Sequence, residues 1–205
     1  MDDGFAAALA EYDRRRAAED GDRTLPLDRR LLAVGPETGA LLNLLAKGTG
    51  ARRVLELGTS YGYSTLWFAD AARATGGRVL TVELDPAKQD FARRMLERAG
   101  LRDVVEFHAG DALDVLPRLD GPFDFVLVDL WKDLYIPCLD LFYPKLAPGA
   151  LIAADNMTEP RSNRANAAAY RHAVRAKPHI TSLLLPVGHG IELSRFTGGL
   201  QAELR

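Results

Sequence analysis

The fold depends most on one stretch of sequence, Phe123-Asp-Phe-Val-Leu-Val-Asp-Leu-Trp-Lys-Asp-Leu-Tyr135. Residues 125–128 within it are continuously apolar, which is typical of a strand covered on both faces. The apolar run stops at Asp129, and Trp131 and Lys132 follow closely. Parallel sheets bind ligands just beyond the carboxyl ends of their strands. The sequence therefore predicts that a carboxylate, an indole and an amine meet at the mouth of a cleft.

A second strand-like run delivers oxygen ligands in the same way. Residues 150–154 are apolar and end in Asp155 and Asn156. Two strands that each end in hard oxygen ligands suggest a divalent cation between them. Taken alone, Asp155-Asn156 is just as typical of a turn or a helix cap.

Around these two runs, strand-like and helix-like segments alternate. Such alternation indicates an α/β protein with an open, mostly parallel sheet. Gly188-His189-Gly190 predicts a hairpin turn, so the last two strands make one edge antiparallel. We expect a single domain over residues 1–205, with residues 1–33 as an N-terminal helical extension. The expected strands span residues 53–57, 78–83, 104–108, 123–129, 150–154, 180–185 and 191–196, and the expected helices 5–19, 38–47, 63–74, 86–99, 112–119, 137–146 and 163–177.

Length, charge and cysteine content limit the function classes. The chain has 205 residues, enough for one domain with a full core, and its net charge of −2 gives no global attraction to nucleic acid or to a membrane. The one cysteine, Cys138, excludes a disulfide within the chain. The N-terminus resembles neither a signal peptide nor an apolar span, so we expect a cytoplasmic protein. The run Arg14–Arg16 is more typical of a solvated helix face than of an RNA contact.

The first expected strand runs into a glycine-containing loop, Glu56-Leu-Gly58-Thr-Ser-Tyr-Gly62-Tyr-Ser64. Glycines here let the backbone approach a ligand, and a simple tight turn is the alternative. The spacing is neither Gly-x-Gly-x-x-Gly nor a P-loop, which disfavours a nicotinamide dehydrogenase. The loop offers Glu56 and hydroxyl groups instead of positive charge. It therefore suits a ligand that carries an amino group and a positive charge.

Two further strand ends complete the predicted cofactor site. Glu83 ends the second strand, where a carboxylate can bind both hydroxyls of a ribose. Gly110-Asp111-Ala112 follows the third strand and can reach an adenine amine. A cationic, ribose-bearing adenine ligand without phosphates is S-adenosylmethionine, which we predict as the cofactor.

Several of these motifs, in this order, resemble the cation-dependent O-methyltransferases, the family of catechol O-methyltransferase and caffeoyl-CoA O-methyltransferase. The resemblance covers about Val34 to Phe196, and its Asp-x-Trp-Lys-Asp-x-Tyr run is closer to the catechol branch. It implies a Rossmann-like class I methyltransferase fold, with a mostly parallel seven-stranded sheet, helices on both faces and an antiparallel C-terminal hairpin. The matching segments are residues 54–64, Val82-Glu83, Gly110-Asp111-Ala112, residues 128–135 and Ala154-Asp-Asn156.

The resemblance also assigns roles to individual residues. It places Mg²⁺, or Mn²⁺ or Ca²⁺ in its stead, on Asp129, Asp155 and Asn156, and it makes Lys132 the general base beside Asp129. Burial and a nearby dication both lower the pKa of a lysine, so this role is chemically sound. A surface lysine is the alternative for Lys132. The cofactor-binding residues that it implies are Val34, Glu56, Gly58, Ser60, Tyr61, Gly62, Ser64, Glu83, Leu84, Asp111, Ala112, Asp129 and Trp131.

The implied acceptor site consists of Lys132, Asn156, Pro160 and Glu192. Glu192 matches a catechol-branch glutamate that accepts from the second hydroxyl, and an outward-facing strand residue is its alternative. Trp131 would pack on the adenine, unless it is an ordinary core aromatic. The chain departs from the mammalian catechol enzyme at Arg30 and Leu32, where that enzyme has an aromatic residue and a methionine lining the slot. This departure hints at an acidic or bulkier aromatic acceptor. The histidines, His108, His172, His179 and His189, show no metal spacing and read as structural or solvated.

These observations predict methyl transfer from S-adenosylmethionine to a hydroxyl of a catechol-like small molecule, by an enzyme that binds neither nucleic acid nor membrane. The resemblance implies a homodimer, with the first helices as the candidate contact. Two alternatives stay open. One is a methyltransferase of the same family that acts on hydroxylated uridine in tRNA, which a basic surface leading to the cleft would favour. The other is a non-catalytic cofactor-binding protein.

Overall fold

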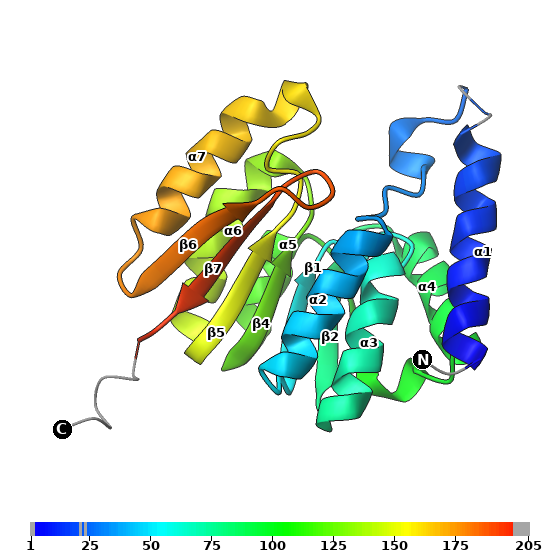
Figure 1. Cartoon of the computed structure of the whole chain (residues 1–205), viewed down its shortest axis with the longest axis horizontal. Helices are drawn as coiled ribbons and strands as arrows, with labels where there is room; N and C mark the ends of the chain where they lie inside the picture. Colours follow the sequence, from blue (N-terminus) through cyan, green and yellow to red (C-terminus); the bar gives the residue numbers. More distant parts are fainter. Residues whose placement is uncertain (1–2, 21, 23, 199–205) are drawn as a thin grey trace.

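The computed structural model describes residues 3–20, 22 and 24–198, and its centre is a seven-stranded sheet (Figure 1). The strand order is β3-β2-β1-β4-β5-β7-β6. The first five strands in chain order pair in parallel, whereas β7 pairs antiparallel with both β5 and β6. The predicted mostly parallel sheet with an antiparallel C-terminal edge is confirmed. The strands are β1 Arg53–Leu57, β2 Arg78–Glu83, β3 Val105–Ala109, β4 Phe123–Val128, β5 Leu146–Ala154, β6 Ile180–Leu185 and β7 Ile191–Phe196.

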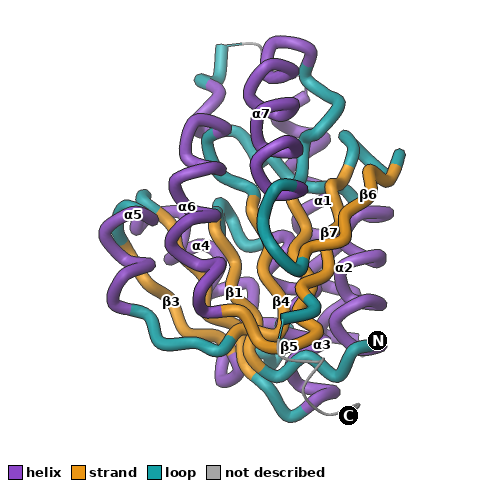
Figure 2. The backbone as a smooth tube through the Cα atoms, turned by 90° about the vertical axis from the view of Figure 1, so that its left-hand side faces the viewer, coloured by secondary structure: helices purple, strands orange, loops and turns teal. Residues whose placement is uncertain are grey.

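Helices lie on both faces of the sheet (Figure 2). On one face α3 packs over β1 and β2, α4 packs over β2 and β3, and α2 lies beside α3. Helix α1 lies outside them against α3 and α4. On the other face lie α5, α6 and α7. The helices are α1 Asp3–Asp20, α2 Pro36–Gly48, α3 Tyr63–Thr75, α4 Pro86–Arg98, α5 Ala112–Val115, α6 Tyr135–Phe142 and α7 Arg164–Arg175.

Successive residues of the central strands point into two different cores. Val54 and Phe125 belong to the core under α2, α3 and α4, whereas Leu55 and Val126 belong to the core under α5, α6 and α7. All four side chains are fully buried. The continuous apolar run in β4 follows from this arrangement, because a strand with helices on both faces has no solvent-facing side.

Prolines shorten two of the expected helices. The helix expected over residues 137–146 ends at Phe142, and the chain continues as a 3-10 turn around Pro144. The helix expected over residues 112–119 likewise changes to a 3-10 turn that contains Pro117. Proline lacks the N–H that an α-helix needs and its ring clashes with the preceding turn, so the hydrogen-bond pattern changes there.

The strand order reverses between β1 and β4, with β2 and β3 on one side and β5 on the other. In open α/β sheets such a reversal creates a crevice at the carboxyl ends of the strands. Backbone hydrogen bonds hold the strand ends together there. The Asp129 N–H donates to the Leu57 carbonyl at 2.9 Å, and the Asp155 N–H donates to the Val128 carbonyl at 3.1 Å. Two of the predicted ligand residues are therefore fixed at one edge of the sheet.

The predicted domain boundaries and the possibility of a membrane-spanning helix concern the whole chain. The predicted single domain includes residues 1–2, 21, 23 and 199–205, which lie outside the described residues, and the boundary of the N-terminal extension stays a prediction. Among the described residues, each helix is either too short or too polar to cross a bilayer.

Candidate active site

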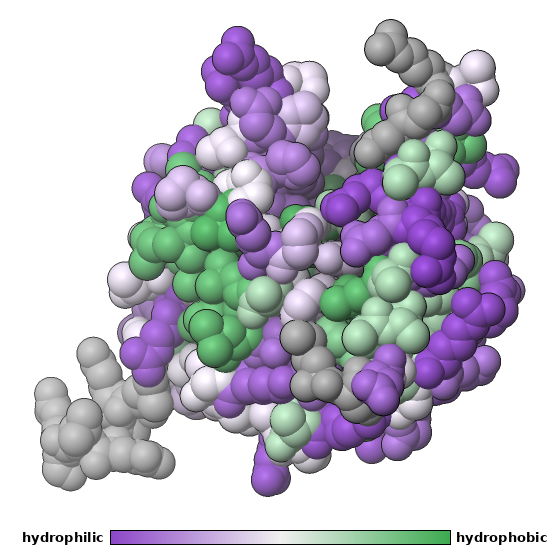
Figure 3. Space-filling model, turned by 45° about the vertical axis from the view of Figure 1, so that its right-hand side comes forward, coloured by the Kyte–Doolittle hydropathy of each residue, from purple (hydrophilic) through white to green (hydrophobic). Residues whose placement is uncertain are grey.

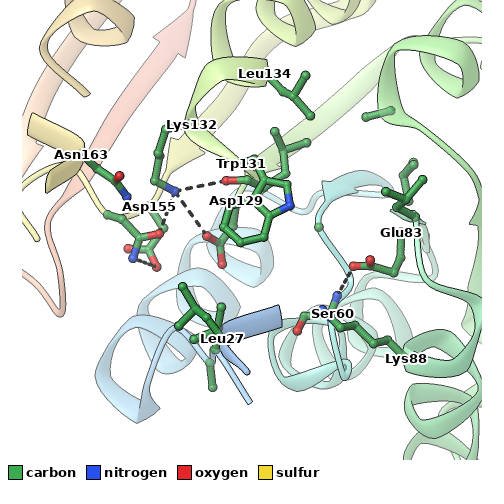
Figure 4. A pocket seen from close by; sticks show the side chains of 18 of the residues that line it. Leu27, Ser60, Glu83, Lys88, Asp129, Trp131, Lys132, Leu134, Asp155 and Asn163 are labelled. Carbon is green, nitrogen blue, oxygen red and sulfur yellow. Dashed lines mark hydrogen bonds and ion pairs between the residues drawn. The ribbon is translucent and has the colours of Figure 1, made fainter. Parts of the chain in front are cut away.

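A cavity of about 420 Å³ opens at the carboxyl ends of β1, β4 and β5 (Figure 4). One wall comes from the loops after these strands. The opposite wall comes from residues 27–33, and Figure 4 shows Leu27 across the cavity from Lys132. Most of the sequence-predicted residues meet here: Gly58, Ser60, Glu83, Leu84, Asp111, Ala112, Asp129, Trp131, Lys132, Asp155, Asn156 and Pro160 line the cavity.

The loop after β1 reaches the cavity because Gly58 allows two backbones to touch. Gly58 has φ +101°, and a Cβ atom there would lie 2.0 Å from the Asp129 carbonyl oxygen. No other residue type fits this approach without moving the end of β4. The following Ser60 also has a left-handed backbone, with φ 46°, and its N–H donates to Glu83 Oε2 at 2.7 Å. Figure 4 shows Ser60 and Glu83 facing each other at the rim of the cavity.

Two large apolar side chains that line the cavity are exposed. Leu84 is 65 % exposed and Trp131 is 56 % exposed, and both line the cavity. Trp131 is therefore not an ordinary core aromatic. Asp111 lies at the same end, where its carboxylate caps α5 by accepting from the Leu113 N–H at 2.8 Å. A flat ring held between apolar surfaces, with carboxylates at its edge, would fit this half of the cavity.

Glu56 lies below the cavity and does not line it. The side chain is fully buried, and its Oε2 accepts from the hydroxyls of Thr65 and Thr81 at 2.5 Å each. Burial raises the pKa of Glu56 to about 7, and the negative charge of Asp129 adds to the effect. Its other carboxylate oxygen, Oε1, is buried and has no hydrogen-bond partner among the described residues. Such an oxygen is an open acceptor that calls for a donor or a cation.

Four more of the expected cofactor contacts shape the site from behind. Val34 and Ser64 are both buried behind the cavity. Gly62, with φ 88°, lets the loop turn into α3. The ring of Tyr61 packs against α1 and α4. None of these four is among the residues that line the cavity.

The buried Asp155 and the half-buried Asp129 form an acidic pair at the other end of the cavity. Asp155 is 1 % exposed, and its Oδ1 has no hydrogen-bond partner among the described residues. Burial, and then the charge of Asp129, raise the pKa of Asp155 to about 8. Burial also raises the pKa of Asp129, although the charges of Lys132 and His189 oppose this. Two carboxylates held together out of water repel each other, so a cation between them would be stabilising.

The Lys132 side chain points toward Asp129 and Asn156. Its Nζ donates to Asn156 Oδ1 at 2.8 Å and to the Leu130 carbonyl at 3.3 Å, and it also donates to the Tyr135 hydroxyl. The Asp129 Oδ1 lies 3.9 Å from the same nitrogen. Burial lowers the pKa of Lys132, against the opposing effect of the two aspartates. The side chain is 7 % exposed, so it is not the surface lysine of the alternative reading.

The residues at this end fit a divalent cation. Two carboxylates and the amide oxygen of Asn156 are hard ligands, and Asp155 Oδ1 has no hydrogen-bond partner in the described part of the chain. Asn156 has a left-handed backbone, with φ 58°, which turns its side chain back toward Lys132. Within the described ranges, no three His, Cys, Asp or Glu side chains are grouped to hold a metal, so the amide oxygen would be an essential third ligand.

The structure does not bring Glu192 to the cavity. Both of its oxygens are bound by Arg175, at 2.7 Å from Nε and 3.1 Å from Nη2, and the Ser182 hydroxyl donates to Oε1 at 2.5 Å. Its side chain has no exposed surface. It lies on the sheet face that α7 covers, because its neighbours Ile191 and Leu193 belong to the core on the opposite face. Strand alternation was the available signal, since a residue beside two core side chains must face the other way.

The acceptor half of the cavity contains residues that the sequence did not predict. Leu27 and Leu31 line it together with Leu32, which was predicted, and Leu27 and Leu32 are 56 % and 46 % exposed. His189, which the sequence suggested to be structural or solvated, also lines it. Arg30 does not, because its Nε donates to the Leu25 carbonyl at 2.9 Å. No local signal marks Leu27 or Leu31, because residues 27–33 have no helical or strand periodicity.

Comparison with known proteins identifies the family of the chain. A family model described as O-methyltransferase matches residues 13–197. A catechol O-methyltransferase of Niastella koreensis is 40% identical over 130 residues, or 62% of this chain and 58% of that protein. A catechol O-methyltransferase of Mycobacterium tuberculosis is 43% identical over 157 residues, or 76% of this chain and 66% of that protein. The chain thus aligns with less than two thirds of the length of each.

Solved structures give the same result over nearly the full chain. An O-methyltransferase of Streptomyces achromogenes involved in tomaymycin synthesis, solved with S-adenosylmethionine, has a TM-score of 0.78 and 31% sequence identity. The match covers 97% of this chain and 91% of that structure. The fold, the cavity at the reversal of strand order and the sequence similarity lead to one conclusion: the chain belongs to the O-methyltransferase family.

Proposed function

We propose that the chain transfers the methyl group of S-adenosylmethionine to one hydroxyl of a catechol-like acceptor, with the help of a divalent cation. One observation supports this most: Asp129, Lys132, Asp155 and Asn156 converge at one end of a cavity that presents Glu83 at its other end and Trp131 between them. The names of the relatives from Niastella and Mycobacterium support the acceptor class.

The cofactor would lie along the β1 and β2 ends of the cavity. Glu83 would bind the ribose hydroxyls, and Trp131 with Leu84 would hold the adenine ring between them. The buried carboxylate of Glu56, with one unpaired oxygen, would stabilise the positive charge of the ligand from below. When bound, S-adenosylmethionine supplies an electrophilic methyl group.

At the reacting end, the chain's own residues would bind and orient the acceptor. Asp129, Asp155 and Asn156 would hold the cation, which supplies Lewis-acid stabilisation of the acceptor oxygens. Lys132 Nζ would accept the proton of the hydroxyl that is methylated, because burial favours its neutral form. Lys132 is itself held in place by Asn156 and Tyr135, so the accepting nitrogen has a fixed position.

The acceptor wall favours an uncharged aromatic ring. Leu27, Leu31 and Leu32 line the cavity opposite the reacting end. The acidic acceptor suggested by Arg30 loses its support, since that guanidinium is turned toward the carbonyls of Leu25 and Asp22. An apolar wall facing a polar, cation-binding floor matches a ring with two adjacent hydroxyls at one edge.

We also propose that the protein is a homodimer. Leu183, Leu185 and Leu193 lie on one face of β6 and β7, and Leu183 is 50 % exposed. No helix covers this face in Figure 1, and Figure 3 shows apolar side chains gathered over this edge of the molecule. Leu44 of α2, 68 % exposed, adds to the exposed apolar surface on this side of the sheet. An apolar face of this kind is typical of a contact between subunits.

A tRNA acceptor is the second candidate, because one charge observation favours it. Residues 160–191 contain five Lys and Arg and no Asp or Glu, and Pro160 and Asn163 at their start line the cavity. Much of this charge is neutralised by acidic residues from elsewhere in the chain. The paired cations are Arg164 with Glu159 at 3.9 Å, Arg175 with Glu192 at 2.7 Å and Lys177 with Asp140 at 2.6 Å.

The test is a methylation screen with S-adenosylmethionine carrying a labelled methyl group. Catechols, caffeoyl esters and tRNA would be offered in parallel, each with and without a chelator. We expect label in the catechol products, lost on chelation. Label in tRNA alone would replace the proposal with the second candidate, and no transfer to any acceptor despite cofactor binding would favour a non-catalytic protein.

A further inference from the structure

The three consecutive arginines of α1 have different environments. Arg14 pairs with Glu11 and Arg16 with Asp13, and the side chains of these two arginines are 68 % and 44 % exposed. Both pairs are surface contacts within the helix. Arg15, between them, is 21 % exposed. Its side chain contacts two walls of the active-site cavity from behind, although it does not line the cavity itself.

The first of these walls is the segment of residues 27–33, here called the strap. Arg15 Nε donates to Glu19 Oε1 at 2.6 Å, and the second oxygen of Glu19 accepts from the Leu31 N–H at 2.5 Å. Arg15 Nη2 also donates to the Arg29 carbonyl at 3.4 Å. The strap has no strand partner and only a short 3-10 turn of its own. Its position over the cavity therefore depends on contacts such as these.

The second wall is the loop of residues 58–62, here called the cofactor loop. The Arg15 guanidinium carbon lies 3.5 Å from the centre of the Tyr61 ring and 4.8 Å from that of Phe91. The Tyr61 hydroxyl donates to the Arg29 carbonyl at 3.0 Å. The same strap carbonyl thus accepts from both Arg15 and Tyr61. Ser60, next to Tyr61, is the cavity residue whose N–H binds Glu83.

We propose that Arg15 is a positioning residue that fixes the strap and the cofactor loop at one separation. The guanidinium is planar, so it can stack on Tyr61 and donate in its own plane to Glu19 and Arg29 at once. A lysine has no such plane and cannot make both kinds of contact. With the two walls joined, the cavity is already shaped before ligands bind, and less conformational freedom is lost on binding. The link to catalysis rests on the proposed methyl transfer.

The test replaces Arg15 by methionine, which keeps the apolar stem over the rings and removes the guanidinium. Arg14→Met and Arg16→Met are matched controls on the same helix. Hydrogen exchange would be followed in peptides covering residues 27–33 and 58–62, and binding of S-adenosylhomocysteine would be measured by calorimetry. We expect Arg15→Met to speed exchange in both segments and to weaken binding by about tenfold. Arg15→Lys should restore neither the slow exchange nor the affinity. Arg14→Met and Arg16→Met should match the unmodified chain in both measurements.

A merely structural role for Arg15 gives a different pattern. In that case Arg15→Met would lower the melting temperature, but hydrogen exchange would not become faster in residues 27–33 and 58–62 together. The folded fraction of the variant would bind S-adenosylhomocysteine with normal affinity. In turnover assays, positioning raises the acceptor KM while kcat at saturation changes less than about twofold. Arg15→Met with exchange and affinity equal to Arg14→Met would overturn the proposal.

A second variant covers the case in which Arg15→Met does not fold. Tyr61→Phe keeps the ring under Arg15 and removes only the hydroxyl that binds the Arg29 carbonyl. It should speed exchange in residues 27–33 while α1 stays protected, and unchanged exchange there would also overturn the proposal. Exchange and S-adenosylhomocysteine binding need no acceptor. A failed acceptor screen would thus reject the catechol reading and leave this test intact.

Discussion

Asp155→Asn should stabilise the metal-free protein, and by an amount that grows with pH. The Asp155 carboxylate is almost fully buried, and its pKa is raised to about 8 from an ordinary value of 3.8. At about 1.36 kcal/mol per pKa unit, the upper limit of this penalty is roughly 6 kcal/mol. Because Asp129 shares the repulsion, we expect about half of that, or ~2–3 kcal/mol. For a chain of this size, such a change shifts Tm by roughly 4–10 °C.

The direction of the pH effect follows from proton linkage. Between the unfolded and the folded pKa of Asp155, the folded state holds the proton more tightly, so the stability of the unsubstituted chain falls as pH rises through this window. The loss is complete above about pH 8 and absent below about pH 4. Asparagine has no charge to bury, so the Tm advantage of Asp155→Asn should be small at pH 5 and largest near pH 8.5.

The assay is thermal unfolding of both proteins in chelator at several pH values, followed by the same series with Mg²⁺. Other titrating groups are common to both proteins and cancel in the difference. Added Mg²⁺ should raise the Tm of the unsubstituted chain at pH 8 and leave Asp155→Asn unchanged. A variant that is less stable at pH 8.5, or a Tm difference that does not grow with pH, would refute the reasoning.

Three further substitutions separate chemistry, fold and cofactor binding. Lys132→Ala should lower kcat by roughly 10²–10⁴-fold, with a smaller loss at high pH where the acceptor hydroxyl ionises unaided, and a pH–rate series shows whether the deficit shrinks. Glu192→Gln should cost roughly 1–3 kcal/mol in a denaturant titration, because it weakens the contact of the buried Glu192 side chain with the half-exposed Arg175. The ratio of regioisomeric methyl ethers should stay constant, and a changed ratio would show that Glu192 belongs to the acceptor site. Trp131→Ala should weaken S-adenosylhomocysteine binding about tenfold, as measured by calorimetry. The Tm should change little, because the indole is 56 % exposed. Equal affinities of the variant and the unsubstituted chain would show that Trp131 does not contact the cofactor.

The sequence could predict the residues of the candidate site that lie at strand ends. Asp129, Glu83 and Asp155 each follow an apolar run, and a parallel sheet brings the carboxyl ends of such runs to one edge. The alternation of helices and strands indicates the type of sheet, but it does not give two features of the strand order, β4 next to β1 and β7 between β5 and β6. Residue type and strand position were sufficient for these residues.

The remaining parts depend on tertiary packing. Leu27 and Leu31 reach the cavity because α1 holds the strap there through Arg15 and Glu19, and no local pattern encodes that contact. Glu192, predicted as an acceptor contact, lies away from the cavity for a related reason. The alternation of β7 shows that Glu192 and Ile191 face opposite ways, yet only the packed structure shows which of the two faces α7 covers.

The central claim is that the group formed by Asp129, Lys132, Asp155 and Asn156 carries out cation-dependent methylation of a catechol. The most direct measurement is the initial rate of methyl transfer to an asymmetric catechol, in chelator-treated enzyme and across a Mg²⁺ titration. The account predicts a negligible rate in excess chelator and saturable recovery with Mg²⁺, with no recovery in Asp155→Asn. Full turnover in excess chelator, or equal rates for Asp155→Asn and the unsubstituted chain, would contradict it.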